Sequence, residues 1–220
     1  MSPPPAATLL LDLDGTLVDS APDLAACLNR RLAARGLAPV ALAEVVGMIG
    51  DGVGALLQRG FAARGMVPDA AALPDFMADY AAHLADATRP YPGAAAALAA
   101  LAGAGWRIGV CTNKPEALAR DVLAATGLLP TIAAIGGGDS FPVRKPDPGH
   151  VRATLARAGG DPARAVMAGD HRNDILAAHG AGLPSVFASW GYGTPEMSAG
   201  ATAVAGSFDA LPQIVAGLLA

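Results

Sequence analysis

The chain has 220 residues, enough for one large domain or for a domain with a modest insertion, and its formal net charge is −4. Because nucleic-acid backbones bind through clustered Lys and Arg, an acidic chain without a basic stripe is not expected to bind nucleic acid, and a small molecule is the expected partner. Hydrophobic residues make up 53% of the sequence. No apolar run approaches the ~18 residues needed to span a bilayer, so no membrane partner is expected.

The two cysteines, Cys27 and Cys111, show none of the close spacings that mark a disulfide framework or a zinc site. Residues 1–7 lack a basic start followed by a long apolar stretch, so they do not resemble a secretory signal. We therefore expect a cytoplasmic protein with reduced thiols. The sequence leaves open whether it is a monomer or a homodimer.

A short apolar run at 8–13 ends in an acidic turn, which is typical of a buried parallel strand. The segment that follows, 20–89, shows helical patterns only. Helices are expected there at 22–34 after a Ser20 cap, and at 41–48, 52–63 and 70–86. The segment is therefore predicted to be an all-helical insertion.

From residue 90 onward, helices and strands alternate. Helices are predicted at 94–103, 116–125, 148–158, 173–180 and 208–219, and strands at 106–111, 131–135, 165–168 and 184–187. This alternation indicates an α/β fold, a Rossmann-like parallel sheet with helices on both faces. The predicted domains are a catalytic core made of 1–19 and 90–220, and the helical insertion at 20–89.

Ligands of such sheets bind beyond the carboxyl ends of the strands, so polar residues just after the strands are the candidate site. Asp12 and Asp14 follow the first strand, and their spacing lets both carboxylates project toward one pocket. Two like charges are tolerated there if a cation neutralises them or one carboxyl is protonated, and both situations suit phosphoryl transfer. An ordinary Asp14-Gly15 turn is the structural alternative.

Two further segments carry groups that suit an anion. Thr112 and Asn113 follow the strand at 106–111 and open a helix, and helix starts bind anions, although either side chain could simply cap the helix. Only two of the 15 basic residues are lysines, Lys114 and Lys145. Lys145 lies in a proline-bracketed loop that would fix its position, although an isolated lysine is usually exposed.

The last segment spaces Asp170 and Asp174 across a strand-to-helix turn. Hard oxygen ligands suit Mg²⁺, which proteins bind through one or two carboxylates. The alternative is a helix cap at Asp170 with Asp174 in the first turn. All four segments occur in order, each just after a predicted strand, and their roles are complementary, so we interpret them as one site.

The motifs that carry this site resemble those of the haloacid dehalogenase superfamily, and the resemblance covers essentially the whole chain. They are Asp12-Leu-Asp-Gly-Thr, Thr112-Asn-Lys, Arg144-Lys-Pro-Asp-Pro and Gly169-Asp-x-x-x-Asp. The segment 20–89 stands where one subgroup of that family carries a cap domain. Further similarity to phosphoglycolate phosphatases lies at 18–23, 50–52, 111–115 and 190–193.

The resemblance implies a Mg²⁺-dependent phosphatase acting on a small phosphorylated metabolite, above all 2-phosphoglycolate. It implies that Asp12 is the nucleophile, that Asp14 is the general acid and base, and that Lys145 stabilises charge. The implied metal ligands are Asp12, Asp14 through its carbonyl, Asp170 and Asp174, and the implied phosphate-binding residues are Thr112, Asn113 and Lys145.

The inserted helices would select the substrate, and the loop Gly50-Asp51-Gly52 is the candidate for contact with it, although the glycines could equally serve a helix turn. Arg59 and Arg64 are expected at exposed helix positions, and the alternative is that one of them compensates the charge of Asp51 beside an anionic substrate. His171 is expected in an exposed loop.

Several other functions remain open at this stage. They are a sugar phosphomutase of the same superfamily, a phosphatase for another small phosphate or pyrophosphate, and an inactive binding module. Dehalogenases resemble this sequence but lack an acid at Asp14, so halide chemistry is disfavoured. Phosphonoacetaldehyde hydrolases use a cap lysine, and 20–89 contains none.

Overall fold

The fold is built around strand β1 (Thr8–Leu11), whose four residues are all buried. The computed structural model describes residues 6–220, so part of the N-terminal segment considered above, 1–5, lies outside the described residues. Within them a six-stranded sheet has the order β5-β4-β1-β6-β7-β8, and every pairing in it is parallel. The other strands are β4 (Arg107–Cys111), β5 (Ala134–Gly136), β6 (Ala165–Gly169), β7 (Ser185–Ala188) and β8 (Ala203–Ala205).

Successive side chains of β1 enter two different apolar clusters, so helices cover both faces of the sheet. Leu9 and Leu11 pack in the cluster that contains residues of α5 (Ala94–Gly103), α6 (Glu116–Ala125) and α9 (Leu211–Gly217). Leu10 packs with α7 (Pro148–Arg157) and α8 (Arg172–Ala181). Burial of each leucine contributes ~2 kcal/mol, which favours an uninterrupted apolar strand here. The predicted α/β fold class is confirmed.

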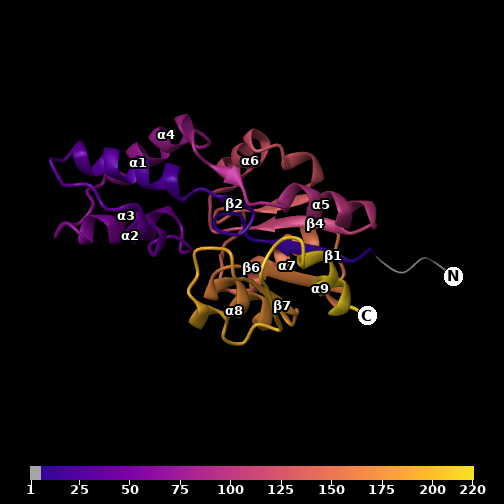
Figure 1. Ribbon diagram of the computed structural model, residues 1–220. Coiled ribbons are helices and arrows are strands. Elements are labelled where there is room, and N and C mark those ends of the chain that lie inside the picture. Colours follow the sequence, from indigo (N-terminus) through magenta and orange to yellow (C-terminus); the bar gives the residue numbers. More distant parts are fainter. Residues whose placement is uncertain (1–5) are drawn as a thin grey trace.

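Four helices form a separate group at one end of the molecule, drawn in indigo and purple in Figure 1. They are α1 (Ala21–Ala33), α2 (Leu42–Val46), α3 (Val53–Ala62) and α4 (Ala72–Ala82), and we call them the helical unit. They surround a second apolar cluster, which includes their Leu28, Phe61 and Phe76 and also Leu118 of α6. The predicted domain limits at 20 and 89 stay a prediction.

Two short segments join the helical unit to the sheet. β2 (Val18–Asp19) and β3 (Arg89–Pro90) pair antiparallel at this junction, where the sequence indicated no strand. The buried carboxylate of Asp23 accepts hydrogen bonds from the backbone N–H groups of Ala87 (2.9 Å) and Thr88 (2.7 Å) and from the Thr88 hydroxyl (2.6 Å). This side chain therefore fastens the start of α1 to the chain just before β3.

Several element limits differ from the prediction. The strand expected at 131–135 begins at Ala134, because Leu129–Thr131 form a 3-10 turn around Pro130. The edge strand β8 was missed, since three residues are too few to show a periodicity. The helix expected at 70–86 extends only from Ala72 to Ala82.

Ser20 stands at the N-cap position of α1, as expected, but its side chain makes no capping hydrogen bond. Its hydroxyl instead donates to Asp14 Oδ1 at 2.6 Å. Within residues 6–220, no helix is both long and apolar enough to cross a membrane.

The Asp23→Ala substitution should lower the free energy of unfolding by about 2 kcal/mol or more, because buried N–H groups at Ala87 and Thr88 would lose their acceptor. Urea unfolding measures this difference. The matched control is Asp121→Ala, which removes an exposed carboxylate from α6 and should change stability by less than about 0.5 kcal/mol. Equal stability of the two variants would contradict the role of Asp23.

Candidate active site

The carboxyl ends of three neighbouring strands bring the predicted site residues together. β1 pairs in register with β4 on one side and with β6 on the other. The residues that follow these strands, Asp12, Thr112 and Asp170, therefore meet at one edge of the sheet.

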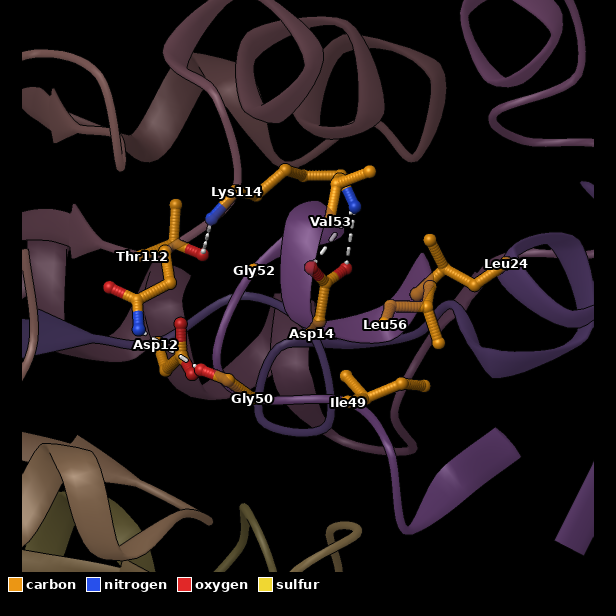
Figure 2. Close-up of a pocket in the computed structure, with 11 residues that line it drawn as sticks. Asp12, Asp14, Leu24, Ile49, Gly50, Gly52, Val53, Leu56, Thr112 and Lys114 are labelled. Atoms are coloured by element: carbon orange, nitrogen blue, oxygen red, sulfur yellow. Dashed lines mark hydrogen bonds and ion pairs between the residues drawn. The ribbon is translucent and has the colours of Figure 1, made fainter. Parts of the chain in front are cut away.

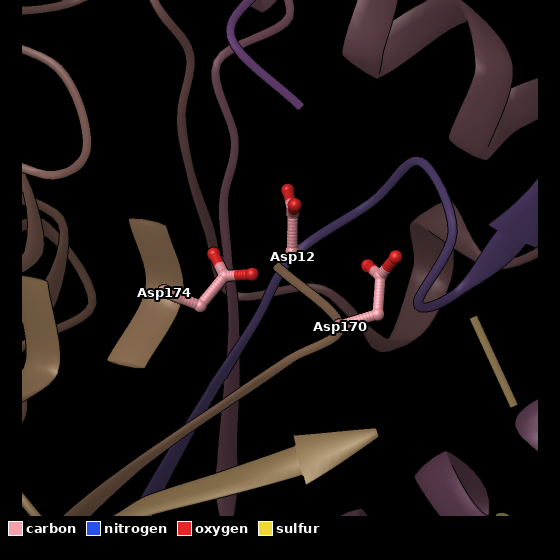
Figure 3. Close-up of side chains that lie close together, drawn as sticks. All are labelled: Asp12, Asp170 and Asp174. Atoms are coloured by element: carbon pink, nitrogen blue, oxygen red, sulfur yellow. The ribbon is translucent and has the colours of Figure 1, made fainter. Parts of the chain in front are cut away.

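Three buried carboxylates converge at this edge, as Figure 3 shows. Asp12, Asp170 and Asp174 each offer an oxygen, and these oxygens lie within 4.8 Å of one another. The Lys145 ammonium contacts Asp12 Oδ1 (3.0 Å) and Asp174 Oδ1 (2.6 Å). Three carboxylates around one ammonium leave excess negative charge in a buried place, and hard oxygen donors with such an excess fit a divalent cation.

The Asp170 carboxylate is held by two donors from distant loops. The Thr16 hydroxyl donates to Oδ1 (2.7 Å), and the Tyr192 backbone N–H donates to Oδ2 (2.8 Å). Gly15 has a φ of +82°, and a Cβ at this position would lie 2.4 Å from Asp170 Oδ2. Glycine is therefore required for the first loop to approach this carboxylate so closely.

Burial makes the carboxylates hard to ionise in the metal-free protein. Loss of hydration, reinforced by the charges of Asp12 and Asp174, raises the pKa of Asp170 to about 7. Burial also raises the pKa of Asp12 to about 6, although Lys145 opposes this shift. Burial lowers the pKa of Lys145, but the two carboxylates beside it outweigh that effect and raise it, so the ammonium stays charged.

Lys145 is 2% exposed, so the alternative of a solvent-facing lysine is wrong. Its carbonyl accepts a hydrogen bond from the Asn113 amide (3.0 Å), and its N–H donates to Nδ1 of His150 (3.2 Å). Burial, together with the charge of Lys145, lowers the pKa of His150 to about 4, which keeps the ring neutral and able to accept. His150 was not identified from the sequence, because a single histidine inside a helix gives no signal of this contact.

Asp14 lines the same pocket as Asp12 but does not belong to the cluster of three carboxylates. Its side chain binds Lys114 and Ser20 instead. Lys114 Nζ donates to Asp14 Oδ1 (2.9 Å) and Oδ2 (3.0 Å), and the Ser20 hydroxyl donates to Oδ1. The ammonium also lies 4.6 Å from the ring centre of Tyr80 on α4. Lys114 is 4% exposed, so both lysines of the chain are buried at this site.

A pocket lies between the strand ends and the helical unit. From the strand ends it is lined by Asp12, Asp14, Thr112, Asn113 and Lys114, and from the helical unit by Leu24, Ile49, Gly50, Gly52, Val53 and Leu56. In Figure 2, Asp12 and Thr112 stand on one side, Leu24 and Leu56 on the other, and Asp14 between them. The pocket therefore has a polar end and an apolar wall.

The residues of the predicted substrate loop, Gly50-Asp51-Gly52, differ in their contacts. Gly50 and Gly52 line the pocket, whereas the Asp51 carboxylate pairs with Arg59 and accepts a hydrogen bond from the Asn173 amide (2.7 Å). The Gly50 carbonyl accepts from the Asn113 amide (3.0 Å). The loop is thus fastened to the strand ends through Asp51 and the Gly50 carbonyl.

His171 does not lie in an exposed loop as expected. It is half-buried, and a Cβ on Gly50, whose φ is +122°, would lie 2.6 Å from its ring. Burial lowers the pKa of His171, and its Nδ1 accepts from the Asn173 N–H (3.2 Å) at the start of α8. Arg59 is exposed as expected, and the partly exposed Arg64 donates to carbonyls within the helical unit.

The fold and the position of the pocket define an α/β enzyme that acts at the carboxyl ends of its parallel strands. The family model of haloacid dehalogenase-like hydrolases matches residues 6–182, and the chain belongs to this family.

The relatives of this chain indicate which reaction a hydrolase of this family performs. A phosphoglycolate phosphatase of Caulobacter vibrioides is 45% identical over 218 residues, which cover 97% of this chain and 92% of that protein. A phosphoglycolate phosphatase of Agrobacterium fabrum is 43% identical over 195 residues, covering 87% and 84%. The crystal structure of a predicted phosphoglycolate phosphatase from Haemophilus somnus superposes with a TM-score of 0.86 at 29% identity, covering 95% of this chain and 97% of that one. The chain is a phosphoric monoester hydrolase.

The contribution of Asp12 and Asp170 to the stability of the metal-free protein should fall as the pH rises from about 5 to about 8, whereas His150 and His171, with lowered pKa values, contribute in the opposite direction up to their ordinary value. Asp12 and Asp170 have pKa values of about 6 and about 7 in the folded chain against 3.8 as the ordinary value, so the folded state binds more protons over this range. The stabilisation is present below the ordinary value and is lost as the pH rises through the folded values. Thermal unfolding in the presence of a chelator, at about pH 5 and at about pH 8, measures this change in stability.

Added Mg²⁺ should restore stability at pH 8, because a cation offsets the charge of the ionised cluster. The Asp170→Asn variant is the control and should show a smaller fall with pH. Stability in chelator that rises from pH 5 to 8 by the same amount in both proteins would contradict the assigned pKa shifts.

The Asp51→Ala substitution should raise KM about 10-fold for phosphate monoesters with different leaving groups alike, because the loop would lose its bond to Asn173, worth about 1 kcal/mol or more. Steady-state kinetics with two aryl phosphates of different size tests this. The control is Asp86→Ala, which removes an exposed acid that pairs with His83. A changed preference between the substrates at unchanged KM would mean that Asp51 contacts the substrate instead.

Proposed function

We propose that the chain hydrolyses a small phosphate monoester through an aspartyl-phosphate on Asp12, with 2-phosphoglycolate as the favoured substrate. The observation that supports this most strongly is the contact of the Asp12 carboxylate with a buried ammonium at the edge of the pocket. The names of the relatives support phosphoglycolate as the substrate. The helical unit, within the predicted limits 20–89, would act as a cap over the pocket.

One oxygen of the Asp12 carboxylate is held by the protein, and the other would attack. Oδ1 accepts from the Leu13 N–H (2.7 Å) and contacts Lys145 Nζ, which leaves Oδ2 to attack phosphorus. The bond between phosphorus and the ester oxygen breaks, and that oxygen takes a proton from Asp14 and leaves as the alcohol. Asp14 then takes a proton from a water that attacks the aspartyl-phosphate, which releases phosphate and restores Asp12.

The phosphoryl oxygens would be bound by the polar end of the pocket. Thr112 and Asn113 are buried and line it, and they would donate through the Thr112 hydroxyl and the backbone N–H of Asn113. Lys145 stands beside the nucleophile and would stabilise the charge that develops on the oxygens. Because these donors are held before the substrate binds, they need no rearrangement during the reaction.

The acidic cluster fits a magnesium ion in its donor set, as its excess of buried negative charge indicates. Asp12, the Asp14 carbonyl and Asp170 would hold the ion, with Asp174 bound directly or through water. Bound Mg²⁺ supplies positive charge that offsets the repulsion between the nucleophile and the phosphate.

The Asp12→Asn substitution should lower kcat at least about 1,000-fold and leave the fold intact, because an amide oxygen is too weak a nucleophile to form the acyl phosphate. Release of inorganic phosphate from 2-phosphoglycolate with Mg²⁺ present measures the activity, and circular dichroism checks the fold. The control is Asp139→Asn, a loop carboxylate that accepts from the Glu116 N–H outside the pocket. Retained activity in Asp12→Asn rules out this nucleophile, and isomerised sugar phosphate without free phosphate from the wild type would favour a phosphomutase.

A further inference from the structure

One buried cation of the pocket has no part in the phosphoryl chemistry described above. Lys145 contacts the nucleophile, whereas Lys114 directs its ammonium toward Asp14, as Figure 2 shows. Lys114 is 4% exposed and stands at the end of β4, close to Tyr80 of the helical unit. Burying an ammonium is costly unless it is paired with an anion. Asp14 supplies that anion here, so a substrate that draws the ammonium away from Asp14 must bring an anionic group of its own.

Away from its polar end, the pocket offers little to a charged or strongly polar group of the substrate. Among the described residues that line it, Lys114 carries the only cationic side chain. The wall from the helical unit presents the apolar side chains Leu24, Ile49, Val53 and Leu56. The hydroxyl groups of a sugar would face this wall without partners, whereas a short hydrocarbon would pack against it.

We propose that Lys114 is the specificity residue that binds a carboxylate of the substrate, and that the substrates are phosphate esters of small 2-hydroxy acids. This inference rests on the proposed function. In such an ester the carboxylate is attached to the same carbon as the ester oxygen. Since Lys114 Nζ lies 2.9 Å from Asp14 Oδ1, a substrate whose ester oxygen meets Asp14 brings its carboxylate to the ammonium.

The hydrogen bonds of Asp14 allow this exchange of partners. Oδ1 accepts hydrogen bonds from both Ser20 and Lys114. Among the described residues, Lys114 is the only hydrogen-bond donor to Oδ2. When the ammonium turns to the substrate carboxylate, Oδ2 faces the ester oxygen, and Ser20 keeps the Asp14 side chain in place. The ring of Tyr80 holds the ammonium at the pocket throughout.

A pair of substrates isolates this role. 2-Phosphoglycolate and ethyl phosphate have the same two-carbon chain, and only the first carries a carboxylate. The Lys114→Met substitution should lower kcat/KM about 100-fold for 2-phosphoglycolate, mainly through KM, and only a few-fold for ethyl phosphate. Lys114→Arg, which keeps the charge, should retain part of the preference. The control Arg120→Met removes an exposed cation of α6 and should keep the wild-type ratio.

The outcomes distinguish a failure of the role of Lys114 from a failure of the phosphatase activity itself. An equal loss on both substrates in Lys114→Met means that Lys114 serves Asp14 alone, and the inference is then wrong. A wild-type enzyme that hydrolyses both substrates equally well overturns the inference and leaves the proposed function standing. Failure of the wild type to release phosphate from either ester overturns the proposed function itself.

Product inhibition tests the same contact without relying on the folding of the Met variant. Glycolate should inhibit the wild type competitively and should bind about 10-fold more weakly to Lys114→Arg, because a guanidinium does not reproduce the position of the ammonium. Ethanol, which lacks the carboxylate, should not inhibit at the same concentration. Equal inhibition of the two proteins by glycolate would contradict the inference.

Discussion

The buried ion cluster of Lys145 with Asp12 and Asp174 is the constraint on which the rest of the site depends. Ionised carboxylates are costly to bury together without a cation, and this ammonium is held between them at 3.0 and 2.6 Å. The surrounding chain serves to keep it there, since Asn113 and His150 bind the backbone of Lys145. The residual negative charge of the cluster suits a divalent cation, whose charge would offset the repulsion between these carboxylates and a phosphoryl group.

The same cluster is linked mechanically to the helical unit through Tyr192. Its N–H binds Asp170 (2.8 Å), and its hydroxyl accepts from the Ser20 N–H (2.7 Å) and donates to Asp19 (2.7 Å) at the junction with the sheet. Asp51 supplies a second link, through the hydrogen bond that it accepts from Asn173. A shift of the helical unit would therefore change both the wall of the pocket and the surroundings of Asp170.

The positions of the acidic residues could be predicted because parallel strands end at one edge of a sheet, so Asp12 and Asp170 had to be neighbours. The partners of Asp14 could not be predicted, because its contact with Lys114 depends on how α4 and its Tyr80 pack near the end of β4. The partner of the Ser20 hydroxyl could not be predicted either. Ser20 stands before the helix whether its hydroxyl points to the backbone or to Asp14.

The central claim is that Asp12 forms a covalent bond to phosphorus. Acid quenching of the wild type within the first turnover, after mixing with Mg²⁺ and 2-phosphoglycolate labelled with ³²P, traps an acyl phosphate on the protein. The account predicts labelled protein whose label maps to the peptide containing Asp12 and disappears in base. Release of labelled phosphate with no labelled protein, or with the label on another residue, would contradict it.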